Sequence, residues 1–590
     1  MPAFAITVLG FVGGAIASLL GHVVASSRRT ARAPAGGDLS LLKPSGVRGC
    51  TSPDLISYRL GVRSWYLKAF PVTCFIAKNL LRLVFGSPRP VRYVVTRWLF
   101  LRLLGLVYLI AFWSLLVQIP GLIGRRGILP AEDYLDEVQA NTDRERYWQF
   151  PTLAWINAGD SFLKGIAATG AVLSALVLLG VDSAPIMFAL WALYLSLSTV
   201  SRDFLGFQWD ALLLETGFIS SFFAPWKIPI PGRGSRLAPR VEASPPMIVL
   251  WCLRWLLFRL MLSSGAVKRL SRDRTWRKLS ALNYHYETQP LATPLSWYAA
   301  KLPDRFQKFS VVMTFVIELG APFLVFAPRP FRLATAGILT SFQFLIAATG
   351  NYTFFNLLTV VLCVPLLDDD VLRPLLPPAT TQGVTGLVAY RRLLDPNMLL
   401  VPPVAGAIAL MTSAQMLSMF SRRGRMPKSI RRLFILQSPF HLVNSYGLFA
   451  VMTTTRPEII VEGSNDGFAW HEYEFKHKPG DLRRPPSWVA PHQPRLDWQM
   501  WFAALSDYRS NPWFVSFMVR LLQGSQPVLA LLERNPFPDA PPRYIRALLY
   551  QYHFTDWKAR RESGAWWRRE LIGVYFPSSS LWGNQIPRTR

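Results

Sequence analysis

The chain has 590 residues, of which 51% are apolar and only 17% are charged, and its formal net charge is +29. Soluble proteins carry about 25% charged residues, so this composition argues against an ordinary soluble enzyme, and its 21 Trp, 38 Phe and 19 Tyr exclude a disordered chain. The basic residues flank apolar runs instead of forming one face, and no nucleic-acid-binding motif is recognisable. We therefore expect no nucleic-acid partner.

Residues 1–96 form a basic N-terminal region. An apolar run covers residues 3–25 and is followed by an Arg- and Ser-rich stretch without acidic residues. Such a segment is a first membrane span, a signal-type segment or part of an organelle address, and the sequence does not separate these alternatives.

Apolar runs dominate residues 97–420. A spanning helix needs about 20 mostly apolar residues, and residues 103–119, with arginines on both sides, fit this description. Residues 166–181 and 184–200 are joined by so few polar residues that we expect an antiparallel helical hairpin. The other runs are 211–223, 247–262, 310–326, 333–348, 354–367 and 404–420. Several are short, so we predict an all-α polytopic membrane domain with about six to nine true spans, in contact with membrane lipids.

Residues 421–590 contain no apolar run long enough to span a bilayer, so we expect a water-facing α+β domain. Residues 458–461 and 470–475 have the character of strands, and Asn-Asp-Gly at 465–467 is typical of a hairpin turn between them. Short amphipathic helices are expected at 498–504, 515–522 and 528–532, under a basic, Trp-rich tail.

Ionisable side chains inside apolar runs are costly in lipid, so they are expected to face the bundle interior or a partner charge. The predicted intramembrane polar network consists of Gln208, Asp210, Glu215, Arg254, Arg259, Lys268 and Glu318. Within it, we expect Asp210 to cap a helix end and Glu215 to form a buried ion pair.

The basic members of this network have their own expected contacts. Arg254 and Arg259 share a helix face with Trp251 and Trp255, a spacing that favours cation–π stacking, with Glu215 or Glu318 as charge partners. Lys268 lies at the end of its span, where a lysine usually extends toward the lipid headgroups.

Signs of catalysis or metal binding are weak. No nucleophile elbow, phosphate-binding loop or dinucleotide fingerprint is recognisable, so we expect no catalytic residue and no cofactor. The four cysteines lie far apart, and the spacing of His471, His477 and His492 does not make them converge, so we expect no metal site. His285 and Glu287 would point the same way on an extended segment but lack a third ligand. Asn351 heads a glycosylation sequon, although its position between two apolar runs argues against modification.

A series of ordered motifs resembles the lipase maturation factor family. The motifs are Phe-Gln-Trp-Asp at 207–210, Leu-Glu-Thr-Gly-Phe at 214–218, Arg-Trp-Leu at 254–256 with Lys268, Asn-Tyr-His-Tyr-Glu-Thr-Gln-Pro at 283–290, Val-Asn-Ser-Tyr-Gly at 443–447, Tyr-Glu-Phe-Lys at 473–476, Lys-Pro-Gly-Asp at 478–481, Arg-Leu-Asp-Trp at 495–498, Met-Trp-Phe-Ala-Ala at 500–504, Asn-Pro-Phe at 535–537 and Pro-Pro-Arg at 541–543. The resemblance covers roughly residues 97–577 and leaves the N-terminal region unmatched.

The resemblance implies a multi-pass endoplasmic reticulum membrane protein with a lumenal C-terminal domain. Family members act as chaperone-like factors in the folding and assembly of secreted dimeric lipases such as lipoprotein lipase, so such lipases are the expected partners. The client-binding candidates that it implies are Tyr473, Glu474, Phe475, Lys476, Arg495, Trp498 and Trp501. Aromatic and Arg side chains dominate interface hot spots, but these side chains suit the core of the domain equally well, and for Trp498 and Phe502 we favour the core.

An alternative comes from a different class of protein. A span that ends in Ser-Gly-x-x-Lys, with a tryptophan downstream, also resembles the membrane domain shared with vitamin-K-dependent carboxylases. In that interpretation, Lys268 would be a desolvated base acting on a quinol-like substrate.

Overall fold

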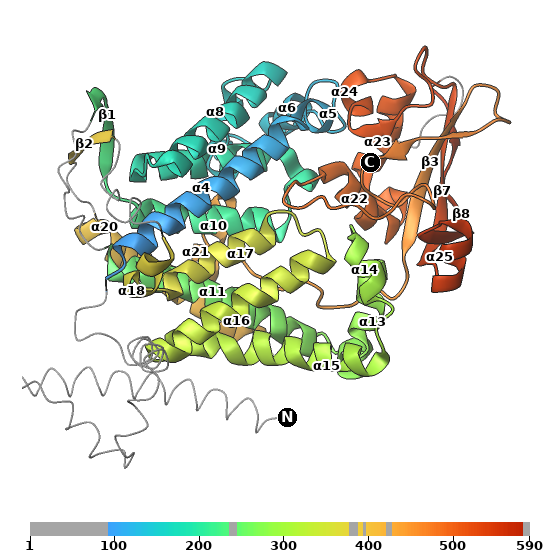
Figure 1. Cartoon of the computed structure of the whole chain (residues 1–590). Coiled ribbons are helices and arrows are strands. Elements are labelled where there is room, and N and C mark those ends of the chain that lie inside the picture. Colours follow the sequence, from blue (N-terminus) through green and yellow to red (C-terminus); the bar gives the residue numbers. More distant parts are fainter. Residues whose placement is uncertain (1–91, 235–244, 377–387, 393–396, 421–427, 582–590) are drawn as a thin grey trace, which may run out of the picture. The chain divides into compact units, whose positions relative to one another are not determined.

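The computed structural model describes residues 92–234, 245–376, 388–392, 397–420 and 428–581 (Figure 1). The apolar run at 3–25 lies outside these residues. Val84–Met416 and Met426–Arg590 form one compact unit, which therefore holds both the helical bundle and the C-terminal domain. Of the second unit, the structure describes only residues 417–420, the last turn of a long helix.

Seven helices of the described residues are long and apolar enough to cross a membrane. They are α4 (Val94–Leu116), α8 (Asp160–Leu179), α9 (Ala184–Ser201), α11 (Met247–Leu270), α15 (Asp304–Phe315), α16 (Arg329–Thr349) and α20 (Asn397–Phe420). α15 continues through a π-helical turn, Val316–Gly320, and a 3-10 turn, Ala321–Phe326. The number agrees with the predicted six to nine spans, and α8 and α9 are the two arms of the predicted hairpin.

Two further apolar helices are shorter than the bilayer and lie within the bundle. α10 (Gln208–Phe223) has 16 residues, about 24 Å at 1.5 Å per residue, against a hydrocarbon core of about 30 Å. α17 (Phe355–Cys363) is shorter still and packs on α11 and α16. Gly217 allows α10 to approach α4 closely, because a Cβ atom there would lie 1.8 Å from the hydroxyl oxygen of Tyr108.

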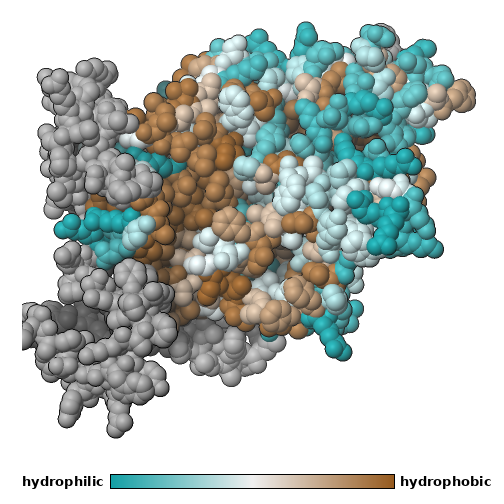
Figure 2. Space-filling model, viewed as in Figure 1, coloured by the Kyte–Doolittle hydropathy of each residue, from teal (hydrophilic) through white to brown (hydrophobic). Residues whose placement is uncertain are grey.

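Hydrophobic residues gather over the helical bundle, whereas hydrophilic residues cover the C-terminal domain (Figure 2). Short helices connect the long ones: α5 (Ile119–Leu122), α6 (Ala131–Asn141), α7 (Arg146–Gln149), α12 (Arg274–Arg277), α13 (Ala281–Thr288), α14 (Pro294–Ala299) and α18 (Asp369–Leu372). α21 (Lys428–Gln437) follows the last long helix and leads toward the C-terminal domain. Two strands, β1 (Lys227–Gly234) and β2 (Val388–Arg392), pair antiparallel.

An antiparallel sheet with strand order β4-β3-β7-β8 forms the C-terminal domain, together with helices on its inner side (Figure 1). The strands are β3 (Pro457–Ser464), β4 (His471–Glu472), β7 (Tyr544–Phe554) and β8 (Trp567–Ser579), and β5 (Glu474–Phe475) pairs separately with β6 (Leu532–Arg534). The predicted hairpin is confirmed, because Glu462 of β3 pairs with Glu472 of β4 across the Asn-Asp-Gly turn.

The helices of this domain are α22 (Arg495–Ala504), α23 (Pro512–Leu522), α24 (Gln526–Leu529) and α25 (Trp557–Ser563). The first two confirm the predicted amphipathic helices. The helix expected at 528–532 instead ends at Leu529, and the chain continues into β6. β7 and β8 were not predicted, because the tail shows no clear alternation of apolar and polar residues. The apolar residues Leu571, Ile572 and Val574 of β8, for example, are all exposed.

Candidate functional site: the junction of the bundle and the C-terminal domain

A buried ion pair joins the bundle to the C-terminal domain. Asp210 lies in the first turn of α10, and Arg495 is the first residue of α22. The guanidinium of Arg495 donates to both carboxylate oxygens of Asp210, at 2.8 and 2.9 Å, and to the carbonyl oxygen of Phe204 at 2.7 Å. Tyr194 of α9 donates its hydroxyl to Asp210 at 2.5 Å. Asp210 thus lies at a helix end as predicted, but its carboxylate makes no capping hydrogen bond and pairs with Arg495 instead.

Glu215 forms the second junction, one and a half turns further along α10. Its carboxylate pairs with Arg259 of α11, which confirms the predicted buried ion pair. It also accepts from the backbone N–H of Asn444 at 3.0 Å and from the hydroxyl of Tyr446 at 2.7 Å. Gln208 accepts from the backbone N–H of Gly447 at 3.0 Å. One face of α10 thus holds residues 444–447, the segment that leads into the C-terminal domain.

The C-terminal end of α4 adds a third set of contacts. Gln118 donates to the carbonyl oxygen of Gln493 at 2.7 Å and accepts from the backbone N–H of Arg495 at 2.9 Å. Ser114 accepts from the backbone N–H of Gln493 at 3.0 Å. Sequence reasoning missed Ser114, Gln118 and Tyr194, because isolated polar residues in apolar runs do not reveal their partners.

Arg254 makes its contacts apart from this junction, whereas Arg259 belongs to the junction through Glu215. Arg254 stacks on Trp251 at 5.2 Å, as predicted, but it donates to the carbonyl oxygen of Pro365 and to the hydroxyl of Tyr93 instead of a carboxylate. Arg259 stacks on Tyr446, and the predicted stacking on Trp255 is wrong. The network is therefore several separate buried clusters.

Lys268 does not extend to the headgroups. Its ammonium lies 2.7 Å from both carboxylate oxygens of Glu318 and 5.4 Å from the ring of Trp276, and both charged side chains are buried. The expected snorkelling is wrong, because Glu318 of the π-helical turn supplies a counter-charge within the bundle. A substrate would have to displace Glu318 before it could use this amine as a base.

The structure buries five of the seven client-binding candidates: Tyr473, Phe475, Arg495, Trp498 and Trp501. Trp498 packs against Trp209 of α10 with a ring separation of 4.7 Å, and Trp501 donates to the carbonyl oxygen of Thr288 at 2.9 Å. Buried side chains cannot touch a partner of the folded protein, so these residues support the fold instead. Glu474 and Lys476 keep solvent-accessible side chains. Phe502, expected in the core, is exposed.

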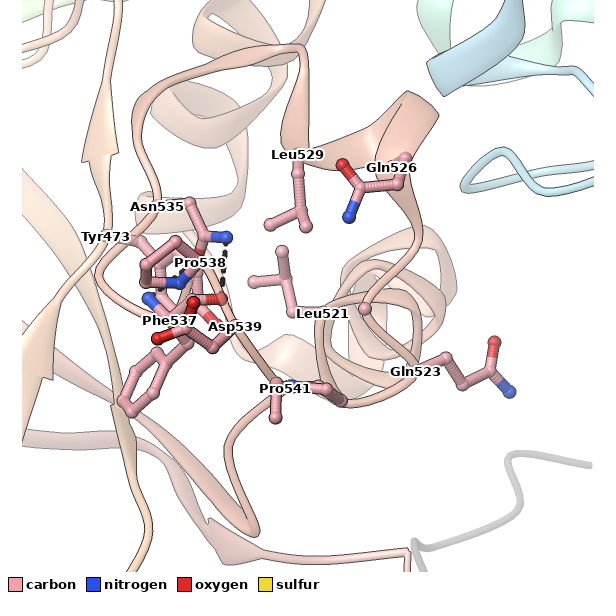
Figure 3. A pocket seen from close by; sticks show the side chains of 12 residues that line it. Tyr473, Leu521, Gln523, Gln526, Leu529, Asn535, Phe537, Pro538, Asp539 and Pro541 are labelled. Atoms are coloured by element: carbon pink, nitrogen blue, oxygen red, sulfur yellow. Dashed lines mark hydrogen bonds between the residues drawn. The ribbon is translucent and has the colours of Figure 1, made fainter.

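Tyr473 also borders a pocket of the C-terminal domain (Figure 3). The pocket lies between α23, α24 and the loop at 535–541, and Leu521, Leu529 and Phe537 contribute to its lining. Burial raises the pKa of the Tyr473 phenol well above its usual value, so this side chain is neutral at physiological pH.

The histidines do not converge on a metal site. No group of three or more His, Cys, Asp or Glu side chains that could hold a metal ion occurs in the part of the chain that the structure describes. His285 and Glu287 lie on helix α13, not on an extended segment, and Glu287 contacts His553 at 3.0 Å. His285 is half-buried beside Tyr352, and desolvation of its ring lowers its pKa to about 4, so it is neutral at physiological pH.

Asn351 is buried and its amide is fully occupied. The nitrogen donates to the carbonyl oxygens of Ala292 and Ser487, at 3.1 and 2.8 Å, and the oxygen accepts from the backbone N–H groups of Val489 and Ala490. This side chain connects the end of the bundle to the C-terminal domain. A glycan cannot be attached to it in the folded state.

The fold and these contacts define a multi-pass membrane protein with a C-terminal α+β domain fixed to its helical bundle by buried polar contacts. Residues 95–374 match the family model for the lipase maturation factor transmembrane domain, and residues 442–577 match the one for the C-terminal domain. The chain belongs to the lipase maturation factor family.

Relatives named lipase maturation factor 1 and lipase maturation factor 2 are similar to this chain over most of their length. Lipase maturation factor 2 from Homo sapiens is 38% identical, over 82% of this chain and 82% of the relative. The Xenopus tropicalis protein of that name is 37% identical over 80% and 81%. Lipase maturation factor 1 from Bos taurus is 34% identical over 84% of this chain and 91% of the relative. No solved structure matches the chain.

Proposed function

We propose that this protein is a chaperone-like factor of the endoplasmic reticulum membrane that helps secreted dimeric lipases, such as lipoprotein lipase, to fold, assemble and mature. Its C-terminal domain would face the lumen, and it would act without a catalytic residue or a cofactor. The observation that carries the proposal is the match to both family domains, at 34% to 38% identity with relatives named for lipase maturation.

The exposed side chains around β5 are the contact surface that we propose for the client. Glu474 pairs with Arg534 at 2.5 Å on the surface, and Lys476 donates to the carbonyl oxygen of Ala530 at 2.7 Å. Exposed ion pairs contribute little to stability, about 0–1 kcal/mol, so these charges can be exchanged for contacts with a partner. The buried Phe475 between them packs on Phe517 and fixes the position of the strand.

A rescue experiment tests this function. Cells that lack their own maturation factor would express the full chain and a secreted lipase, and lipase activity would be measured per unit of secreted lipase mass. We expect the full chain to restore this specific activity and Lys268→Ala, if it folds, to retain it, because Lys268 has no catalytic role in the proposal. A well-expressed, correctly located full chain that restores nothing would contradict the proposal.

The contact surface needs variants that spare the fold. Glu474→Ser combined with Lys476→Ser should lower the rescued specific activity at an unchanged protein level. The matched control removes one exposed cation and one exposed anion from β8, by Arg568→Ser with Glu570→Ser, and should rescue fully. A truncation after Phe420 would be less informative, because it removes Arg495 and leaves Asp210 buried without its partner.

A further inference from the structure

Four apolar or aromatic side chains form an exposed surface where the bundle meets the C-terminal domain. Leu295 and Tyr298 come from α14, Leu302 from the turn after it, and Trp557 from α25, far along the chain. Their exposed fractions are 44%, 45%, 41% and 49%. Tyr298 and Trp557 contact each other, with ring centroids 5.8 Å apart. We call these four residues the interfacial patch.

Aromatic rings and cations lie next to the interfacial patch. Trp297, which is fully buried, lies 4.7 Å from Trp557 and 5.9 Å from Trp566, ring to ring. The guanidinium of Arg560 lies 3.3 Å from the centroid of Trp566, and the ammonium of Lys301 lies 5.3 Å from that of Trp297. Stacking on the rings fixes the position of both cations beside the apolar side chains.

The interfacial patch continues the lipid-facing surface of a membrane span. α15 begins at Asp304, two residues after Leu302, and exposes Phe306, Phe309 and Val312 along its length. Single apolar residues are common on soluble surfaces, but these apolar residues belong to a helix that crosses the membrane, and Leu302 lies only two residues before that helix begins. Asp304 and Lys308 form a half-exposed ion pair at the start of α15, which marks the level of the headgroups.

The same chemistry recurs elsewhere at this end of the bundle. Arg146 stacks on Tyr147 at 5.0 Å and on Trp155 at 5.6 Å, and Tyr147 and Trp148 are exposed. These residues precede α8, whose first residue, Asp160, accepts from the backbone N–H of Arg125. The carbonyl oxygen of Arg125 in turn accepts from Arg520 of the C-terminal domain. Tryptophan and tyrosine with nearby arginine and lysine are typical of the zone where a membrane protein leaves the bilayer.

We propose that the phospholipid headgroup layer around α15 also covers the interfacial patch, and that α14 and α25 together hold the C-terminal domain against the membrane surface. Tyr298 and Trp557 would lie at the level of the ester groups, and Lys301 and Arg560 would reach the lipid phosphates. This inference needs only the membrane class of the protein and is independent of its client.

Photo-crosslinking in a defined bilayer tests the inference. The full chain would carry p-benzoylphenylalanine in place of Trp557, be reconstituted into phosphatidylcholine nanodiscs, be irradiated and be analysed by mass spectrometry. Phe309, exposed on α15, is the matched position for lipid contact, and Phe468, 90% exposed at the tip of the β3–β4 hairpin, is the matched position for water. We expect phospholipid adducts at position 557 close to the yield at 309 and several-fold above the yield at 468.

A second position protects the test against local misfolding. The crosslinker in place of Tyr298 should give the same phospholipid adducts, because Tyr298 belongs to the interfacial patch from the bundle side. The inference is overturned if positions 557 and 298 both give no more lipid adduct than position 468. It is also overturned if they crosslink to a second copy of the chain or to an added lipase instead of lipid.

Discussion

The ion pair between Arg495 and Asp210 gives the sharpest prediction. Arg495→Met removes every hydrogen bond of the guanidinium and leaves the Asp210 carboxylate buried, with the hydroxyl of Tyr194 as its one remaining contact among those described. Breaking a buried ion pair by removing one partner costs about 3–5 kcal/mol, because the remaining charge is uncompensated. We expect a loss of this size in the free energy of unfolding of the C-terminal domain.

A double-mutant cycle separates the ion pair from simple loss of packing. Asp210→Asn alone should also destabilise strongly, because Arg495 is then the uncompensated buried charge. The double variant removes both charges, so its cost should be smaller than the two single costs added, by about 0.5–3 kcal/mol.

The assay is proteolysis of the purified full chain in detergent across a denaturant series, since cleavage follows the population of the opened domain. Arg534→Met is the matched control: Arg534 is 62% exposed in its pair with Glu474, and such pairs contribute about 0–1 kcal/mol. If Arg495→Met destabilises no more than Arg534→Met, or if the two single costs simply add, the reasoning is refuted.

Three further predictions use the same preparation. Gly217→Ala should destabilise by about 1–3 kcal/mol, because the new methyl group overlaps Tyr108, whereas Gly337→Ala, which meets nothing within 4 Å, should be neutral or stabilising in thermal unfolding. The unfolded chain protonates His285 near pH 6.5, whereas the folded chain protonates it only near pH 4. Folding stability that is present above pH 6.5 is therefore lost as the pH falls toward 4, by up to about 1.4 kcal/mol per pH unit. His285→Asn should reduce this pH dependence of the free energy of unfolding, measured by denaturant titration. When the chain is expressed in mammalian cells, treatment with a glycosidase should not change its mass, because the Asn351 amide is buried. A glycan detected on Asn351 would contradict this prediction.

The bundle was largely predictable because its signal is local. A span is a continuous stretch of apolar residues, so hydropathy located α4, α8, α9, α11 and α16, although α4 begins nine residues before the predicted run and α11 ends eight residues after it. The turn at 465–467 was predictable for a similar reason, since Asp-Gly favours one tight geometry. β7 and β8 were missed because their outward faces are partly apolar, which removes the alternation that identifies a strand.

The candidate site was predictable in its residue types but not in its pairings. Intramembrane charge is costly, so Asp210, Glu215 and Lys268 could be selected from the sequence as residues that need partners. Only the folded chain gives those partners: Asp210 and Arg495 are 285 positions apart. The packing of the whole chain also turned the aromatic motifs of the C-terminal domain inward, so Trp501, which sequence reasoning assigned to a contact surface, is buried.

The sequence by itself determined that this protein crosses the membrane several times, that a polar domain follows, and which charges must be neutralised, because each of these depends on the chemistry of neighbouring residues. The tertiary structure decided which charges meet, that the C-terminal domain and the bundle form one compact unit, and that side chains of α14 and α25 meet in the interfacial patch. Contacts between distant segments depend on how the whole chain packs, and no local pattern encodes them.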